Sequence, residues 1–292
     1  MKKWIIAVTF IILAACSTSR SDKKVTWVQE EHNEETAAKV RSTAKERRAH
    51  GKHENKHGEG KEDKGHAGEV HWTYSGKGGP ASWGKLSPAF SACSSGKHQS
   101  PIDVANGIEA DLRAIEINYH VGGKEIINNG HTVQVNYEPG SNIVVDEREF
   151  ELKQYHFHAP SEHTIKGKSY PLEVHFVHAD KKGNLAVIGV MFEEGRANES
   201  LAQAWKYLPK KEGESHDLEP AISVETLLPG LNREYYRYSG SLTTPPCSEG
   251  VRWFVLKQPV TASSAQIEKF SHALHEPNNR PVQDVNARVV LQ

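Results

Sequence analysis

The sequence predicts one mainly β domain (α+β) over residues 71–292, built on a largely antiparallel sheet with short helices at its periphery. Three observations support this fold class. Short runs rich in β-branched and aromatic residues recur, turn-forming pairs separate them, and helical signals are few. The length of this region suits a single domain.

The expected strands follow one another at short intervals. In chain order they cover residues 115–119, 132–137, 142–145, 151–158, 172–178, 186–192, 235–239 and 252–256. Asn129-Gly130, Pro139-Gly140 and Lys182-Gly183 lie between these runs, and such pairs are typical of turns. Hairpins are therefore expected. Helices are expected from about Leu201 to Tyr207 and from the Ser263-Ser264 region to Leu274.

The N-terminus has the layout of an export signal. Lys2 and Lys3 precede an apolar run over residues 4–13, which is shorter than the ~20 residues that span a bilayer. The tetrapeptide Leu13-Ala14-Ala15-Cys16 resembles the lipobox of bacterial lipoproteins. We therefore expect residues 1–15 to be a signal peptide, Cys16 to carry the lipid, and the protein to be a membrane-anchored lipoprotein of the periplasm or cell envelope. Cleavage of an ordinary signal near this cysteine is the alternative.

Residues 16–70 are predicted to be a solvated linker. Between Lys45 and Gly68 there is no Val, Ile, Leu, Met, Phe, Tyr or Trp, so this stretch cannot bury a core. It contains His53-Glu54-Asn55-Lys56-His57, which matches the H-E-x-x-H motif of zinc proteases. That motif needs a packed helix, whereas here glycines recur, each costing a helix about 1 kcal/mol. A spacer is favoured over a protease, and weak metal binding by the linker histidines stays open.

The charge balance excludes some partners. The formal net charge is −1 at pH 7, so nothing indicates a nucleic acid or a polyanionic substrate.

Histidines are concentrated in the stretch from Gln154 to His163, which reads QYHFHAPSEH. On a strand, alternation places His156 and His158 on one face. In the 172–178 run His175 and His178 lie on opposite faces, so only one of them can join this pair. Three neutral histidines with an open fourth position are the usual arrangement of a catalytic zinc. Histidines satisfied in the core or exposed by chance are the alternative.

Further motifs carry a resemblance to a known family. They are Gln99-Ser100-Pro101-Ile102-Asp103, Asn128-Asn129-Gly130-His131, the stretches 154–163 and 172–180, and Gly240-Ser241-Leu242-Thr243-Thr244-Pro245-Pro246-Cys247. Together they resemble the alpha-class carbonic anhydrases, in their bacterial branch. His71-Trp72-Thr73-Tyr74 and Asn279-Arg280-Pro281-Val282-Gln283 are similar to the family's first and last landmarks, so the likeness covers residues 71–292. It implies the family's single domain with a large, twisted, mostly antiparallel central sheet.

The resemblance also implies the activity and the site. The expected reaction is zinc-dependent, reversible hydration of carbon dioxide to bicarbonate and a proton, by attack of a zinc-bound hydroxide. His156, His158 and His175 are similar to the zinc ligands, which would make His178 a packing or surface residue. Glu162 and Thr243 resemble the pair that orients the hydroxide, with the Thr243 hydroxyl donating to the carboxylate.

Other residues take their expected roles from the same resemblance. His131 matches the proton shuttle, and a residue that titrates near neutrality suits that task. Gln154 is expected to hold His156, and Glu173 to hold His175. The remaining matches form an apolar substrate site and a water network: Val177, Val187, Leu242, Thr243, Thr244, Val251 and Trp253 for the substrate, and Tyr74, Asn129, Gln134 and again Thr244 for the water chain.

Cysteine usage completes the expectations. If Cys16 carries lipid, Cys93 and Cys247 remain, and an exported chain meets an oxidising compartment, so a disulfide is expected; free buried thiols are the alternative. It would pin the loop that presents Thr243. The family further implies a cis Pro245-Pro246 bond. A homodimer is common among bacterial relatives, but no residue requires it, and a non-catalytic binding module on the same fold is the rival function.

Overall fold

The computed structural model describes residues 70–120, 122–230 and 233–292. The expected signal peptide, Cys16, His53 to His57 and the linker up to residue 69 lie outside the described residues. Within the described ranges, no helix combines the length and the apolar character that crossing a membrane requires.

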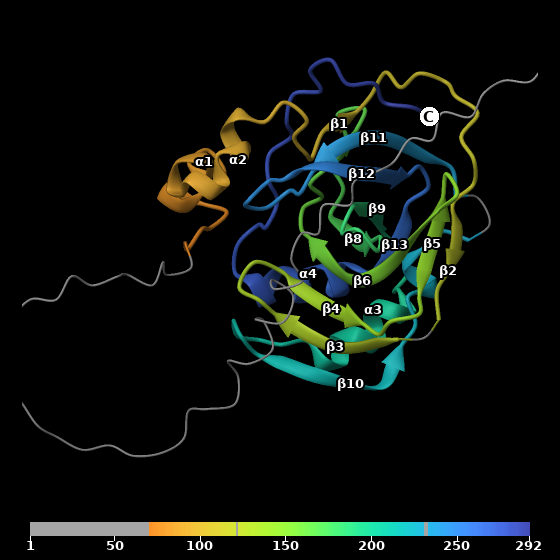
Figure 1. Cartoon of the computed structure of the whole chain (residues 1–292). Coiled ribbons are helices and arrows are strands. Elements are labelled where there is room, and N and C mark those ends of the chain that lie inside the picture. The colour runs from red at the N-terminus through yellow and green to blue at the C-terminus, as the bar shows by residue number, and fades with distance from the viewer. Residues whose placement is uncertain (1–69, 121, 231–232) are drawn as a thin grey trace, which may run out of the picture. The chain divides into compact units, whose positions relative to one another are not determined.

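One large mixed sheet organises this part of the chain (Figure 1). Its main path runs β10-β3-β4-β6-β8-β9-β12-β11, with β2, β5 and β13 paired beside it. The strands are β2 (Glu116–Asn118), β3 (Gly123–Asn128), β4 (Val133–Tyr137), β5 (Asn142–Val145), β6 (Arg148–His158), β8 (Leu172–Ala179), β9 (Leu185–Glu194), β10 (Ser215–Ile222), β11 (Tyr235–Ser241), β12 (Glu249–Leu256) and β13 (Val260–Ala262).

The prediction of a mostly antiparallel sheet is confirmed. Within the described ranges, every pair in this sheet is antiparallel except those that β9 makes with β12 and with β13. A separate small sheet pairs β1 (Asp103–Val104) in parallel with β7 (Thr164–Ile165). The sequence did not predict β1, β3, β7, β10 or β13. β10 is an edge strand, mostly exposed and interrupted by Pro220, so it lacks the alternation that marks a half-buried strand.

Two of the three expected turns join paired strands. Asn129-Gly130 lies between β3 and β4, and Lys182-Gly183 between β8 and β9, and both pairs are antiparallel. The hairpin expected at Pro139-Gly140 is wrong, because β4 and β5 do not pair with each other. Both pair with β6, which makes them successive segments along one edge of that strand.

Each face of the sheet carries its own apolar cluster. One cluster includes Tyr155, Phe157 and Phe176, and the helical residues Leu201 and Phe270 pack against it. The other includes Val187, Val251 and Trp253. Because side chains alternate along a strand, β8, β9 and β12 contribute to both clusters.

Helices α3 (Glu199–Ala204) and α4 (Ser264–Leu274) lie against the first face (Figure 1). Both were predicted, and η3 (Trp205–Tyr207), a 3₁₀ turn, completes the first. Ser263 and Gln266 form a capping box that begins α4. The sequence did not predict the short elements η1 (Gly76–Gly78), α1 (Trp83–Leu86), η2 (Pro88–Phe90), α2 (Ala92–Ser95) and η4 (Glu225–Leu227), because a single turn carries no helical periodicity.

Candidate metal centre

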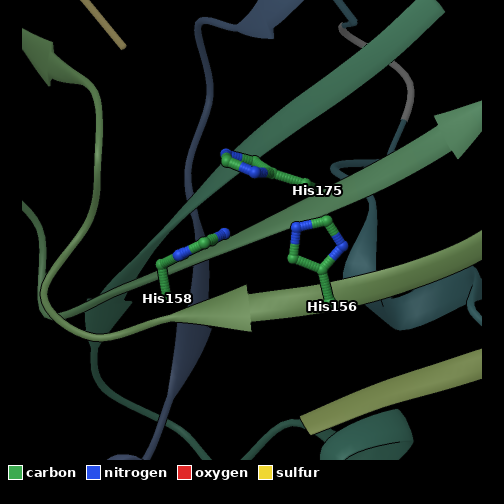
Figure 2. Close-up of side chains that lie close together, drawn as sticks. All are labelled: His156, His158 and His175. Carbon is green, nitrogen blue, oxygen red and sulfur yellow. The ribbon is translucent and has the colours of Figure 1, made fainter. Parts of the chain in front are cut away.

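Three histidine rings meet on the face of the sheet opposite α3 and α4. His156 and His158 project from the same side of β6, and the register of β6 with β8 sets His156 opposite His175. Figure 2 shows the three rings turned toward one another from these two adjacent strands. Each ring offers a nitrogen, and these nitrogens lie within 4.8 Å of one another. His158 and His175 are buried and His156 is half-buried, so the group opens toward solvent beside His156.

The other ring nitrogens are held by outward hydrogen bonds. These join His156 Nδ1 to Gln154 Oε1 at 2.8 Å, His158 Nδ1 to the main-chain oxygen of Asn278 at 2.7 Å, and His175 Nε2 to Glu173 Oε1 at 2.9 Å. Each acceptor fixes the tautomer of its ring, because the proton must sit on the outward nitrogen. The lone pairs of His156 Nε2, His158 Nε2 and His175 Nδ1 therefore point inward.

The electrostatics favour neutral rings on β6. Burial lowers the pKa of His156 well below its ordinary value, and the neighbouring rings lower it further. Burial also lowers the pKa of His158. For His175 burial acts in the same direction, but the charge of Glu173 outweighs it and raises the pKa. Burial alone would raise the pKa of Glu173, yet His163 and His175 hold it well below the ordinary value, so this carboxylate is ionised.

Two buried atoms at the centre lack partners among the described residues. They are His158 Nε2 and Glu162 Oε2, which lie 3.5 Å apart. With its proton on Nδ1, His158 presents a lone pair here, and an ionised carboxylate oxygen can only accept. Two acceptors facing each other in a buried space are unfavourable unless a cation or a proton donor lies between them. The donor set and this unsatisfied pair fit a divalent metal with nitrogen ligands.

The expected bond between Thr243 and Glu162 is not formed in this structure. Glu162 Oε1 accepts from the main-chain N–H of Arg280 at 2.9 Å. Its Oε2 is turned instead toward His158 Nε2 and toward His175 Nδ1, which lies 3.8 Å away. Thr243 is buried in the turn between β11 and β12, and no hydrogen bond joins it to Glu162 among the described residues.

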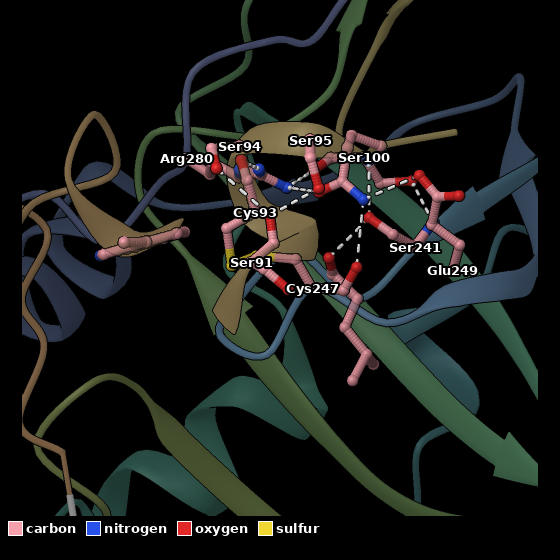
Figure 3. The surroundings of a disulfide bond; sticks show 12 residues. Ser91, Cys93, Ser94, Ser95, Ser100, Ser241, Cys247, Glu249 and Arg280 are labelled. Atoms are coloured by element: carbon pink, nitrogen blue, oxygen red, sulfur yellow. Dashed lines mark hydrogen bonds between the residues drawn. A yellow bond between two sulfur atoms is a disulfide. The ribbon is translucent and has the colours of Figure 1, made fainter. Parts of the chain in front are cut away.

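Cys93 and Cys247 form the predicted disulfide (Figure 3). Gln99 Nε2 donates to the main-chain oxygen of Cys247, and the Arg280 guanidinium donates to that of Cys93. The Pro245-Pro246 bond is cis, as expected, and so are Ser100-Pro101, Ala159-Pro160 and Glu219-Pro220. The disulfide therefore ties the loop of Thr243 to the segment around α2.

The expected apolar residues gather on the histidine face. Val187, Val251 and Trp253 are buried in one cluster, and the half-buried Val177 and Leu242 pack against it. Thr244 is half-buried beside them in sequence. The Trp253 ring lies 4.8 Å from that of His175. An uncharged, apolar molecule at the three nitrogens would therefore meet a hydrophobic wall.

His131 is half-buried, and its ring stacks on Trp72 with the centroids 3.6 Å apart and the planes 9° apart. Tyr74 packs beside Trp72, and its hydroxyl is buried with no hydrogen-bond partner in the described chain. Two of the other three residues expected in a water network are engaged with the protein: Asn129 Oδ1 accepts from the main-chain N–H of His131 and of Thr132, and Gln134 Nε2 donates to Asn136.

Sequence reasoning missed three residues that build the site. Asn278 holds His158. His163 donates from Nδ1 to Glu173 Oε1 at 2.8 Å and lies 2.7 Å from the hydroxyl of Tyr238, so it is a buried link and no part of the histidine group. Gly189 pairs with His175, and a Cβ there would lie 2.9 Å from Glu173 Oε1. None of these residues stands in a pattern that signals its role without the fold.

Residues 78–292 match the family profile described as eukaryotic-type carbonic anhydrase. The chain belongs to this family. It is 50% identical over 222 residues to a carbonic anhydrase of Pectobacterium carotovorum, covering 76% of this chain and 91% of the relative. A carbonic anhydrase of Neisseria gonorrhoeae is 46% identical over 228 residues, with 78% and 90% covered.

A solved structure agrees with these sequence relatives. The alpha-carbonic anhydrase of Thermovibrio ammonificans, in complex with the inhibitor sulfanilamide, superposes with a TM-score of 0.75 at 52% identity, covering 77% of this chain and all of the other. The fold expected from the resemblance is confirmed. The chain is thus an enzyme of the carbonic anhydrase class, and the family supports hydration of carbon dioxide as its reaction.

Proposed function

We propose that the enzyme hydrates carbon dioxide reversibly to bicarbonate and a proton with a zinc ion held by His156, His158 and His175. One observation carries the choice of metal site. Three inward lone pairs converge from two strands while the opposite nitrogens are fixed, and one of the three, on His158, is buried with no partner in the described part of the chain. Three histidine nitrogens with a fourth position open are typical of catalytic zinc.

When bound, zinc lowers the pKa of a coordinated water to about 7, as is established for carbonic anhydrases as a class, and so supplies a nucleophile at neutral pH. The chain contributes rigidity. Gln154, Asn278 and Glu173 hold the three rings in the required tautomers. The negative charge on Glu173 also makes His175 a more basic ligand.

Glu162 and Thr243 orient the attacking oxygen in this proposal. An ionised carboxylate only accepts hydrogen bonds, so a threonine hydroxyl that donates to it must accept from the nucleophile. This role requires Glu162 Oε2 to turn from the histidines toward Thr243. In its present direction Oε2 faces the lone pair of His158 Nε2 and accepts no hydrogen bond from the described residues, so the turn gives up no bond. Val187, Val251 and Trp253 receive the apolar substrate.

His131 carries the product proton away from the site. It lies on the turn after β3, half-buried, where its imidazole can exchange protons with solvent. Its stacking on Trp72 gives the ring a defined resting position.

The test is stopped-flow carbon dioxide hydration by the purified full chain, with elemental analysis for zinc. We expect stoichiometric zinc and a rate far above background in the native protein, and loss of both in His156→Ala. A binding module on the same fold would show no hydration above background, which would contradict the proposal. Cleavage of a protein substrate that survives His156→Ala and is lost in His53→Ala would instead support the protease alternative.

We also propose that the enzyme is exported and anchored through a lipid on Cys16, in the periplasm or cell envelope. The basis is the charged, apolar and small-residue layout of residues 1–16. Metabolic labelling with a radioactive fatty acid should mark the native protein and leave Cys16→Ala unlabelled. Equal labelling of the two would overturn the anchor.

A further inference from the structure

Asn278 occupies an unusual position between the histidine group and the turn that carries His131. It follows α4 in a short connecting segment and is buried, with 2% of its surface exposed. Its main-chain oxygen accepts a hydrogen bond from Nδ1 of His158, one of the proposed zinc ligands, at 2.7 Å. The main chain of this residue thus already belongs to the site, and the question is what its side chain does.

The side-chain amide makes three hydrogen bonds, all to main-chain groups. Oδ1 accepts from the N–H of Ala159 at 2.9 Å. Nδ2 donates to the oxygen of Phe157 at 2.8 Å and to the oxygen of His131 at 3.1 Å. The N–H of Ala159 is a donor and both oxygens are acceptors, so the amide can have only one orientation. All of its donor capacity is used.

These bonds connect two parts of the protein that the chain separates. Phe157 and Ala159 flank His158, the ligand at the end of β6, whereas His131 belongs to the turn between β3 and β4. Asn129 Oδ1 holds the turn from within through the N–H groups of His131 and Thr132, and the Thr132 hydroxyl ties the end of the turn to the Phe157 oxygen of β6. The Asn278 amide adds a link at His131 itself, because its Nδ2 bonds to the main-chain oxygens of both His131 and Phe157.

We propose that Asn278 is a positioning residue that holds the His131 main chain at a fixed distance from the metal ligands and thereby sets the path of the proton. The inference rests on the proposed function, in which His131 is the shuttle. Proton transfer depends steeply on distance and alignment, whereas hydration itself needs only the three ligands, Glu162 and Thr243. Loss of the amide donors should therefore slow proton export more than substrate conversion.

Asn278→Asp is the sharpest variant, because it keeps the shape and the acceptor but sets a carboxylate oxygen against two carbonyl oxygens. Asn278→Ala serves if the aspartate variant does not fold. Thr132→Val is the matched control: the Thr132 hydroxyl donates to the same Phe157 oxygen at 2.6 Å, so this change removes a comparable buried bond and leaves the His131 bond intact.

The full chain with bound zinc is measured by stopped flow. We expect kcat of Asn278→Asp to fall at least fivefold and kcat/KM by less than twofold, with stoichiometric zinc and with kcat restored by an added imidazole buffer that carries the proton from solution. Thr132→Val should retain its kcat. Equal falls in kcat and kcat/KM, no rescue by the buffer, or an unchanged kcat would each overturn the proposal.

A second readout does not depend on activity. In the metal-free protein, amide hydrogen exchange followed by NMR should be at least tenfold faster at His131 in Asn278→Asp than in Thr132→Val. Equal exchange rates would show that the amide does not hold the turn, whatever the enzyme does. Inactivity of the native protein would refute the proposed function alone and leave this measurement standing.

Discussion

Two histidines three residues apart on β8 show how the two faces of the sheet differ. His175 and His178 are both buried, with 1% and 0% of their surface exposed. His175 lies on the face of the candidate metal centre, beside His156 and His158. His178 lies on the opposite face, where its Nδ1 bonds to the oxygen of Ala186 and its Nε2 lies 2.6 Å from the Tyr119 hydroxyl.

The difference lies in which ring nitrogens have partners. Both nitrogens of His178 are satisfied by neutral groups, and burial lowers its pKa to about 4, so the ring is neutral and closed to ligands. His175 is tied at Nε2 to an ionised carboxylate and keeps Nδ1 directed at the neighbouring rings. Burial therefore does not distinguish a structural histidine from a ligand. The unfilled nitrogen does.

The largest expected effect comes from replacing His175 by alanine, with the same replacement at His178 as the comparison. His175→Ala should lower the rate of carbon dioxide hydration by on the order of 10³-fold or more, because the metal supplies the nucleophile, and should reduce bound zinc. The matched variant His178→Ala should keep stoichiometric zinc and most of the rate. Activity lost equally in both variants, measured on folded protein by stopped flow, would break the comparison.

Removing the disulfide tests whether the anchoring of the Thr243 loop supports the stability of the fold or the affinity for zinc. Cys93→Ser should lower the free energy of unfolding by about 2–5 kcal/mol, because the bond closes a long loop, while zinc affinity changes little. Thermal unfolding under oxidising conditions and titration with zinc give the two quantities. Cys247→Ser should behave alike. Stability equal to that of the native protein would contradict this expectation.

His178 should also make the free energy of unfolding of the protein fall at acid pH. Its pKa is about 6.5 in the unfolded chain and about 4 in the fold, so the unfolded state binds the extra proton between these values. Stability from this group is complete above pH 6.5 and is lost as the pH falls to about 4, amounting to about 3 kcal/mol. The free energy of unfolding can be measured with urea at pH 7 and at pH 4. Its decrease between these pH values should be smaller in His178→Phe than in the native protein, by that amount.

Tyr119→Phe is the control for that measurement, since it removes a hydrogen bond to His178 but keeps the imidazole. It should lower stability at both pH values and retain the acid-sensitive loss. If His178→Phe loses as much stability between pH 7 and pH 4 as the native protein does, another group causes the acid sensitivity. The measurement would then not support a neutral, fully bonded His178.

The smallest effect is expected at the outward partner of His175. Glu173→Gln removes the charge that accepts from this ring and sets an amide among N–H donors of Glu162 and His163. Zinc affinity should fall about 10–100-fold in competition with a chelating dye. Gln154→Ala, which removes the neutral partner of His156, should cost less. If Gln154→Ala lowered zinc affinity more than Glu173→Gln did, the charge of Glu173 would not be what supports His175 as a ligand.

Local pattern was sufficient for much of the fold. Alternation along residues 151–158 and 172–178 showed that His175 and His178 lie on opposite faces, so that only one of them can join His156 and His158, and this follows from strand geometry alone. The family likeness then favoured His175 and predicted the roles of Glu162, Thr243 and His131. Residues 215–222 and 123–128 gave no such pattern, because an edge strand with proline and a strand with mixed burial satisfy no simple period.

The sequence by itself determined the strand alternation, the histidine face and the family, because these depend on residue types at close spacing. Only the tertiary structure decided that Asn278 holds His158 and the His131 turn, that Gly189 leaves space for Glu173, and that Glu162 faces the histidines. Except for Glu162 and His158, which are four residues apart, these contacts join residues distant in the chain. They exist only after the sheet has set the distances between segments, and no local spacing records them.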